Sequence, residues 1–180
     1  MVEESLAQEI ERLESEGIIA GARVLRSEQW APGNVTVGGD VGLELYQQQT
    51  GLLFSHMFGA VATAGVAPTF THTFTPGDLS GKAFTAQVGR PDVGGVVRAF
   101  TYAGCKVASW ELAVEAGENA TLGLTVIGMT ETTATPLAVA TFATDAARPL
   151  NFRHGAVTIA GAAAKVRALT VSADNMLSDD

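Results

Sequence analysis

Short runs of alternating apolar and polar residues, separated by glycines at intervals of about ten residues, recur from Asn34 toward the end of the chain. The first run places its apolar residues on one parity: Val35, Val37, Val41, Leu43 and Leu45. A period of two puts alternate side chains on opposite faces of a β-strand. Many such strands with regular turn signals predict an antiparallel β-sandwich or half-barrel.

The alternation and the glycines together delimit the predicted strands. These are Asn34 to Tyr46, Thr69 to Thr75, Lys82 to Val88, Val96 to Ala103, Lys106 to Glu115, Leu122 to Ile127, Leu137 to Phe142, Ala156 to Ile159 and Val166 to Ser172. Two other segments show helical spacing instead. Glu3 to Gly17 repeats leucine or isoleucine every three or four residues among glutamates, and Thr50 to Gly59 pairs apolar residues in the same way. Each ends at a glycine that suits a helix C-cap.

The distribution of charge divides the chain into three parts. The net charge is −8, and residues 1–16 carry −5 of it, whereas Asp174, Asp179 and Asp180 carry −3. We therefore expect one domain over 1–180, with an acidic N-terminal helix in 1–17, a neutral β-rich body in 18–173 and an acidic tail in 174–180. Charged residues are only 17% of the chain, against roughly 25% in typical domains.

A neutral, charge-poor body does not suit DNA binding, because binding by counterion release needs clustered lysine and arginine. It does suit association with copies of itself, since few charges must be desolvated when two such surfaces meet. Charged side chains on an edge strand prevent it from pairing with another chain, and this body has few of them. We therefore expect the edges to be satisfied between subunits.

The residues that usually carry catalysis or bind metal form no pattern here. Cys105 is the one cysteine, so no intramolecular disulfide is possible, and a buried inert thiol is expected. His56, His72 and His154 lack metal-ligand spacing. No catalytic residue, metal site or cofactor is predicted. The acidic N-terminus does not resemble a secretory signal, and no apolar run is long enough to span a bilayer, so we expect synthesis in a reducing cytoplasm and no membrane partner.

The loop Gly89 to Gly95 is the most distinctive local segment. It combines Arg90, Pro91 and Asp92 with Gly94 and Gly95 between two predicted strands. One interpretation is a surface turn whose Arg–Asp pair contributes little. The other is an ordered loop that contacts a neighbouring copy.

Three blocks in a fixed order then point to a family: THTFTPGDL (71–79), VGRPDVGG (88–95) and FTYAGCKVASWEL (100–112), followed by Gly117 and Glu118. Weaker similarity reaches back to the helix that ends at Gly59 and forward to Ala168–Asn175. The sequence resembles the major tail tube proteins of long-tailed, non-contractile bacteriophages. The segment Met1 to Arg26 matches only vaguely, so no role for the acidic helix follows from the resemblance.

The resemblance implies a structural virion protein, made in the host bacterial cytoplasm, with a flanking helix beside the β-fold. It implies hexameric rings in which neighbouring subunits complete a shared β-barrel, and stacked rings through which the genome passes into the host. Its implied partners are copies of itself and the tail tip, tail terminator, tape measure and tail assembly proteins. DNA would cross the lumen without specific binding, and the polar side of Asn34 to Tyr46 is a candidate lining. Arg90, Asp92, Gly94 and Gly95 are the predicted subunit contact.

Two alternatives remain at this stage. One is a monomeric β-sandwich that binds carbohydrate or a protein, although two tryptophans and two tyrosines provide few stacking platforms. The other is an enzyme whose site is not recognisable from motifs.

Overall fold

The computed structural model describes residues 3–14, 30–48, 50–67, 69–141 and 148–177. Its strands are β1 (Glu3–Glu4), β2 (Ala7–Glu14), β3 (Trp30–Glu44), β4 (Gly59–Val66), β5 (Thr69–Pro76), β6 (Phe84–Pro91), β7 (Val97–Glu115), β8 (Thr121–Gly128), β9 (Thr130–Thr132), β10 (Val157–Ile159), β11 (Ala162–Ala164) and β12 (Ala168–Asp174). One α-helix, α1 (Gly51–Phe58), and a 3-10 turn, η2 (Phe152–His154), accompany them in the described residues. The mainly β, antiparallel architecture with one short helix is confirmed.

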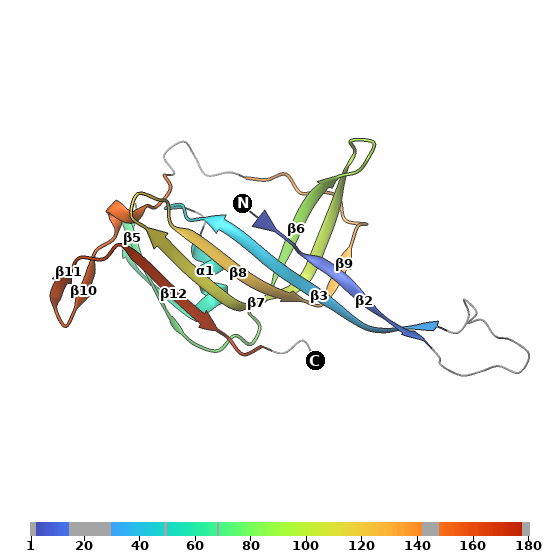
Figure 1. Cartoon of the computed structure of the whole chain (residues 1–180), viewed down its shortest axis with the longest axis horizontal. Coiled ribbons are helices and arrows are strands. Elements are labelled where there is room, and N and C mark those ends of the chain that lie inside the picture. Colours follow the sequence, from blue (N-terminus) through green and yellow to red (C-terminus); the bar gives the residue numbers. More distant parts are fainter. Residues whose placement is uncertain (1–2, 15–29, 49, 68, 142–147, 178–180) are drawn as a thin grey trace, which may run out of the picture.

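An eight-stranded sheet forms the centre of the molecule, in the order β1-β3-β8-β7-β12. Strand β2 also pairs with β3, and β6 and β9 pair with β7. The pairs β4–β5 and β10–β11 are separate two-stranded ribbons. In Figure 1 the β2–β3 ribbon extends toward one end of the long axis, the β10–β11 ribbon lies at the other end, and the β6–β7 hairpin stands away from the sheet.

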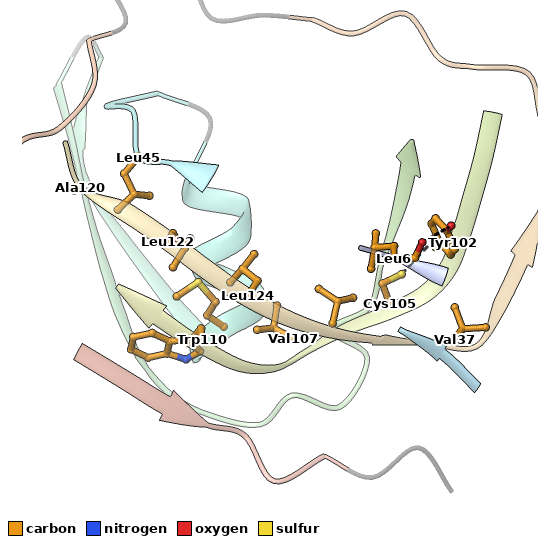
Figure 2. Close-up of a cluster of buried hydrophobic side chains, with 12 residues drawn as sticks. Leu6, Val37, Leu45, Tyr102, Cys105, Val107, Trp110, Ala120, Leu122 and Leu124 are labelled. Carbon is orange, nitrogen blue, oxygen red and sulfur yellow. Dashed lines mark hydrogen bonds between the residues drawn. The ribbon is translucent and has the colours of Figure 1, made fainter. Parts of the chain in front are cut away.

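One part of the core lies between the main sheet and α1, and another part, with Leu6, Tyr102 and Cys105, lies away from the helix (Figure 2). From β8 the core takes residues of one parity, Leu122, Leu124 and Val126, which are at most 3% exposed. The helix contributes Met57, and the Phe58 ring lies 5.1 Å from that of Trp110. Burying an aliphatic side chain of this size stabilises the fold by about 1.5–3 kcal/mol. The apolar residues predicted at alternate positions from Val37 to Leu45 are thus the residues that point into the core.

Strand β7 is one continuous strand of 19 residues, whereas the sequence predicted two strands with a break at Gly104. The break is a β-bulge: Phe84 pairs with Cys105 and Ala86 with Tyr102, so β7 has one extra residue there. Gly104 has a φ of 69°, and an added Cβ would lie 2.7 Å from the Met129 side chain. The glycine therefore bends the strand without ending it.

The predicted N-terminal helix over Glu3 to Gly17 is wrong for residues 3–14, which form β1 and β2 along β3; residues 15–17 lie outside the described residues. Leu6 enters the core at 2% exposure, and Ile10 pairs across to Val35. A helix of this length is marginal in water, and its narrow apolar stripe buries little. Pairing with β3 satisfies the backbone and buries Leu6, so the strand is favoured.

The predicted strand Leu137 to Phe142 is also wrong over residues 137–141, which have no regular structure; Phe142 lies outside the described residues. Gln87 bonds this segment with its side chain: its Nε2 donates to Pro136 O (3.0 Å) and its Oε1 accepts from Ala138 N (2.6 Å). These side-chain bonds take the place of a backbone ladder. The sequence analysis also missed β4, β9 and β11. Asp174 of the predicted acidic tail ends β12, and Asp179 and Asp180 are outside the described residues.

Candidate assembly surfaces

The tip of the β6–β7 hairpin brings together three of the four predicted contact residues. The Asp92 carboxylate Oδ1 accepts from Gly94 N and Val96 N, each at 2.9 Å, and Gly95 N donates to Asp92 O at 2.9 Å. Gly95 has a φ of 79°, a conformation that favours glycine. Asp92, Gly94 and Gly95 therefore build one ordered turn that presents the fully exposed Val93.

Asp92 pairs with Arg98 across the hairpin, with 3.0 Å between Oδ2 and Nε. The pKa of the Asp92 carboxyl lies below its ordinary value. The largest cause is the hydrogen bond from the Val96 backbone, followed by those from the Arg98 side chain and the Gly94 backbone. The charge pair expected between Arg90 and Asp92 is absent from this described hairpin, because Arg90 is engaged elsewhere.

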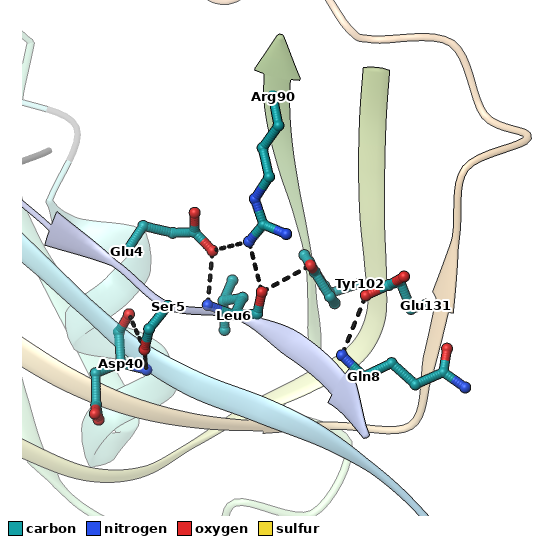
Figure 3. A network of polar contacts seen from close by, with 8 residues as sticks. All are labelled: Glu4, Ser5, Leu6, Gln8, Asp40, Arg90, Tyr102 and Glu131. Carbon is teal, nitrogen blue, oxygen red and sulfur yellow. Dashed lines mark hydrogen bonds and ion pairs between the residues drawn. The ribbon is translucent and has the colours of Figure 1, made fainter. Parts of the chain in front are cut away.

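Arg90 binds the N-terminal segment (Figure 3). Its Nη2 lies 2.7 Å from Glu4 Oε1 and donates to Leu6 O at 2.6 Å, and its guanidinium lies 4.9 Å from the centre of the Phe100 ring. Burial lowers the pKa of Arg90, but the hydrogen bond to Glu4 and the charge of its carboxylate raise it above its ordinary value. The Glu4 side chain is 9% exposed, so this pair is more shielded than a surface ion pair.

The same segment is also held by Tyr102, which lies beside Arg90, and by Asp40 on its other side (Figure 3). The buried Tyr102 hydroxyl donates to Leu6 O at 2.8 Å, and burial raises its pKa, so it remains protonated and able to donate. Ser5 N donates to Asp40 O at 2.9 Å, and Asp40 N donates to Ser5 Oγ at the same distance. Residues 4–6 are thus fixed at both backbone and side chains.

This anchoring cluster was not predicted from the sequence, because Arg90 and Glu4 lie 86 residues apart and no local motif links them. The sequence placed Asp92 beside Arg90 in the loop, whereas the folded chain brings Glu4 to it. Glu4 lies two residues before Leu6, and nothing in this short segment of sequence marks Glu4 as the partner of Arg90.

The face of the main sheet that lies opposite the core carries mostly small and acidic side chains, and is here called the acidic face. The register aligns Asp40, Thr125, Ser109 and Asp174 in one row across β3, β8, β7 and β12. Its acidic residues are Glu3, Asp40, Glu44, Glu111, Glu115 and Asp174, with Lys106 as the base at one end. A hollow of about 600 Å³ lies on this face, bordered by Glu3, Asp40, Glu111 and Asp174.

The histidines and the cysteine do not form a chemical site. His56 is buried in α1 against Phe84, and no described residue forms a hydrogen bond with its Nδ1. His72 Nδ1 lies 2.9 Å from Thr63 Oγ1, and His154 Nδ1 accepts from Asn151 N. Burial raises the pKa of the Cys105 thiol, which keeps it in its unreactive form. No group of three metal-ligating side chains occurs within the described ranges.

A family model described as phage tail tube protein matches residues 2–180. The chain belongs to the phage tail tube protein family. None of the curated proteins to which the sequence was compared matches it. No helix of the described tail tube protein is long and apolar enough to cross a membrane.

Membership decides among the alternatives that the sequence left open. The protein is a structural component of the phage virion and not an enzyme, and its place is the tail tube. Such a protein polymerises with itself, so its functional residues are those on the surfaces where copies meet.

Replacing Arg90 with alanine tests whether it anchors the N-terminal segment. Arg90→Ala leaves the shielded Glu4 carboxylate without its cation, and we expect a loss of about 1–3 kcal/mol and faster amide exchange over residues 3–14. Hydrogen-exchange mass spectrometry of the unassembled protein measures this. Arg98→Ala is the matched control, since it should affect the hairpin tip alone; equal exchange over residues 3–14 in both variants would contradict the anchoring role.

Acid titration tests the turn built by Asp92. A lowered folded pKa means that the carboxylate's stabilisation is complete above the unfolded pKa, about 3.9, and is lost as the pH falls through the folded value. We expect the Gly94 and Val96 amide signals in NMR spectra to shift with a midpoint below 3.9. Asp92→Asn should abolish that transition. A midpoint at or above the ordinary value would show that the carboxylate is not held by these donors.

Proposed function

We propose that this protein forms the tube of a long, non-contractile phage tail as stacked hexameric rings, each closed by β-pairing between neighbouring subunits. The tube is the conduit for genome delivery into the host. The observation that carries this proposal is the open edge of β12, which ends the main sheet.

Strand β12 pairs with β7 alone among the described residues, and all seven of its residues are exposed. It carries no charge before Asp174, although charged side chains are the usual protection of a strand edge. Leu169 and Val171 are 38% and 43% exposed on it. An uncharged edge with exposed apolar side chains favours pairing with a strand of another subunit.

The direction of the β12 backbone identifies the groups available for such pairing. Asn175 N donates to Ala108 O, and Ala116 N donates to Arg167 O, so the odd-numbered residues direct their backbone groups toward β7. Backbone groups alternate sides along an antiparallel strand. Thr170 and Ser172 therefore direct their N–H and C=O groups toward the open edge.

The acidic face supports a position at the lumen. This face is hollowed, and its charged residues are acidic apart from Lys106 at one end. It therefore lacks the clustered cations that bind a phosphate backbone. A wall that bound DNA would retain it, whereas repulsion permits passage. This face includes the polar side of β3, with Asp40 and Glu44.

The tip of the β6–β7 hairpin is a further subunit contact in this proposal. Asp92, Gly94 and Gly95 hold it in one conformation, which lowers the entropy cost of docking. Arg90 acts at its base by fixing the N-terminal segment beside it. The tail tip, tail terminator, tape measure and tail assembly proteins are the proposed partners beyond the tube itself.

A proline at position 170 tests the role of the open edge. Thr170→Pro removes an N–H that points away from β7, and proline is tolerated on edge strands. We expect a chain that folds, with an unchanged circular dichroism spectrum, but forms no tubes in negative-stain electron microscopy.

The matched control is Thr170→Ala, which removes the same side chain and keeps the N–H. It should form tubes of normal diameter. Tubes of normal diameter from the proline variant would rule out pairing of subunits along this edge.

A further inference from the structure

The β2–β3 and β10–β11 ribbons lie at opposite ends of the long axis (Figure 1), and in the described residues each borders an uncovered apolar surface. One is the β2–β3 ribbon from Ala7 to Glu14 and from Trp30 to Val37, here called the arm. Its exposed apolar side chains are Ile10, Leu13 and Val35 on one face and Trp30 on the opposite face, each between 47% and 57% exposed. A two-stranded ribbon is marginally stable alone, so this arm needs a partner for its apolar surface.

The arm is also acidic. Arg12 is occupied within it, since its Nε lies 2.9 Å from Glu14 and its guanidinium lies 5.4 Å from the centre of the Trp30 ring. Glu9 and Glu11 have no cation paired with them among the described residues. A partner for the arm should therefore combine apolar and basic groups.

The second surface, here called the groove, is an open hollow of about 580 Å³ between the end of the main sheet, η2 and the β10–β11 ribbon. Its apolar lining includes Leu45, Leu112, Leu150, Phe152, Val157 and Leu169. Lys165 and His154 also line it, and none of its lining residues is acidic. The surrounding segment 148–173 contains Arg148, Arg153, Lys165 and Arg167 and no acidic residue.

We propose that the arm of one subunit occupies the groove of the next, an inference that rests on the proposed polymeric tube. Both surfaces are apolar, and their charges are opposite, so joining them buries apolar area and pairs acids with bases. They lie at opposite ends of one chain, so the arm cannot fill the groove of its own subunit. A heterologous contact builds a ring where its rotation closes and a filament where it does not. In this proposal the arm contact is the one that does not close, and it joins one ring to the next.

Cysteine cross-linking between two variants tests the contact. Ile10→Cys places a thiol on the arm and Ala156→Cys places one on the exposed wall of the groove, while the native Cys105 is buried. Tubes assembled from an equal mixture and then oxidised should yield a disulfide-linked dimer on non-reducing gels. Each variant assembled alone should yield none. Leu52→Cys, on the exposed side of α1, mixed with Ala156→Cys is the matched control and should also yield none.

The outcomes separate this inference from the proposed function. Wild-type protein that forms no tubes overturns the proposed function and the arm contact together. Normal tubes without a cross-link above the Leu52→Cys control overturn the arm contact alone. A cross-link only between the arm and groove variants supports it.

A charge exchange gives a second readout that does not depend on oxidation. Lys165→Glu and Glu11→Lys should each reduce the rate of tube elongation followed by light scattering, and the double variant should recover it. Loss in the single variants without recovery in the double variant would contradict pairing between these two surfaces.

Discussion

The alternation along β7 is the constraint on which the rest of the structure depends. This strand pairs with β6, β8, β9 and β12, so the alternation along it sets the two faces of the sheet. The bulge between Val107 and Ser109 shifts the alternation by one residue, and Val107 and Trp110 both reach the core. Trp110 and Leu112 lie toward α1, whereas Ser109 and Glu111 lie on the acidic face. A shift of one residue would exchange the two faces and put carboxylates into the core. The apolar residues on the core face thus stabilise the subunit, while the opposite face remains available to line the lumen of the proposed tube.

The anchored N-terminal segment shows how a polar cluster can complete such a core. Leu6 fills a buried position, and its carbonyl oxygen accepts from both Arg90 and Tyr102. Because a buried carbonyl group without donors costs about 1–3 kcal/mol, these two donors make the burial of Leu6 favourable. The cluster also fixes the start of β2, and therefore the direction in which the arm leaves the sheet.

The sequence predicted the main sheet well wherever one face is buried and the other is polar, as in β3 and β8. It failed where a pattern fits two structures: Leu6, Ile10 and Leu13 suit a helix by spacing, yet residues 3–14 pair with β3. It also failed at Gly104, since a glycine ends one strand and bends another equally well. The turn at Asp92 follows from local residues and was predictable, but the partner of Arg90 was not, because only the folded chain brings Glu4 to it.

A tail tube protein functions as one of many identical subunits, so the role of each face depends on whether it borders the lumen, a neighbouring subunit or the outside of the tube. The most direct test is a cryo-electron microscopy map of the assembled tube, fitted with the subunit. The account predicts that Asp40, Thr125 and Glu111 border the lumen, with α1 on the outer side of the sheet and β12 paired to a strand of the neighbouring subunit. A map in which α1 borders the lumen and the acidic face points outward would contradict it.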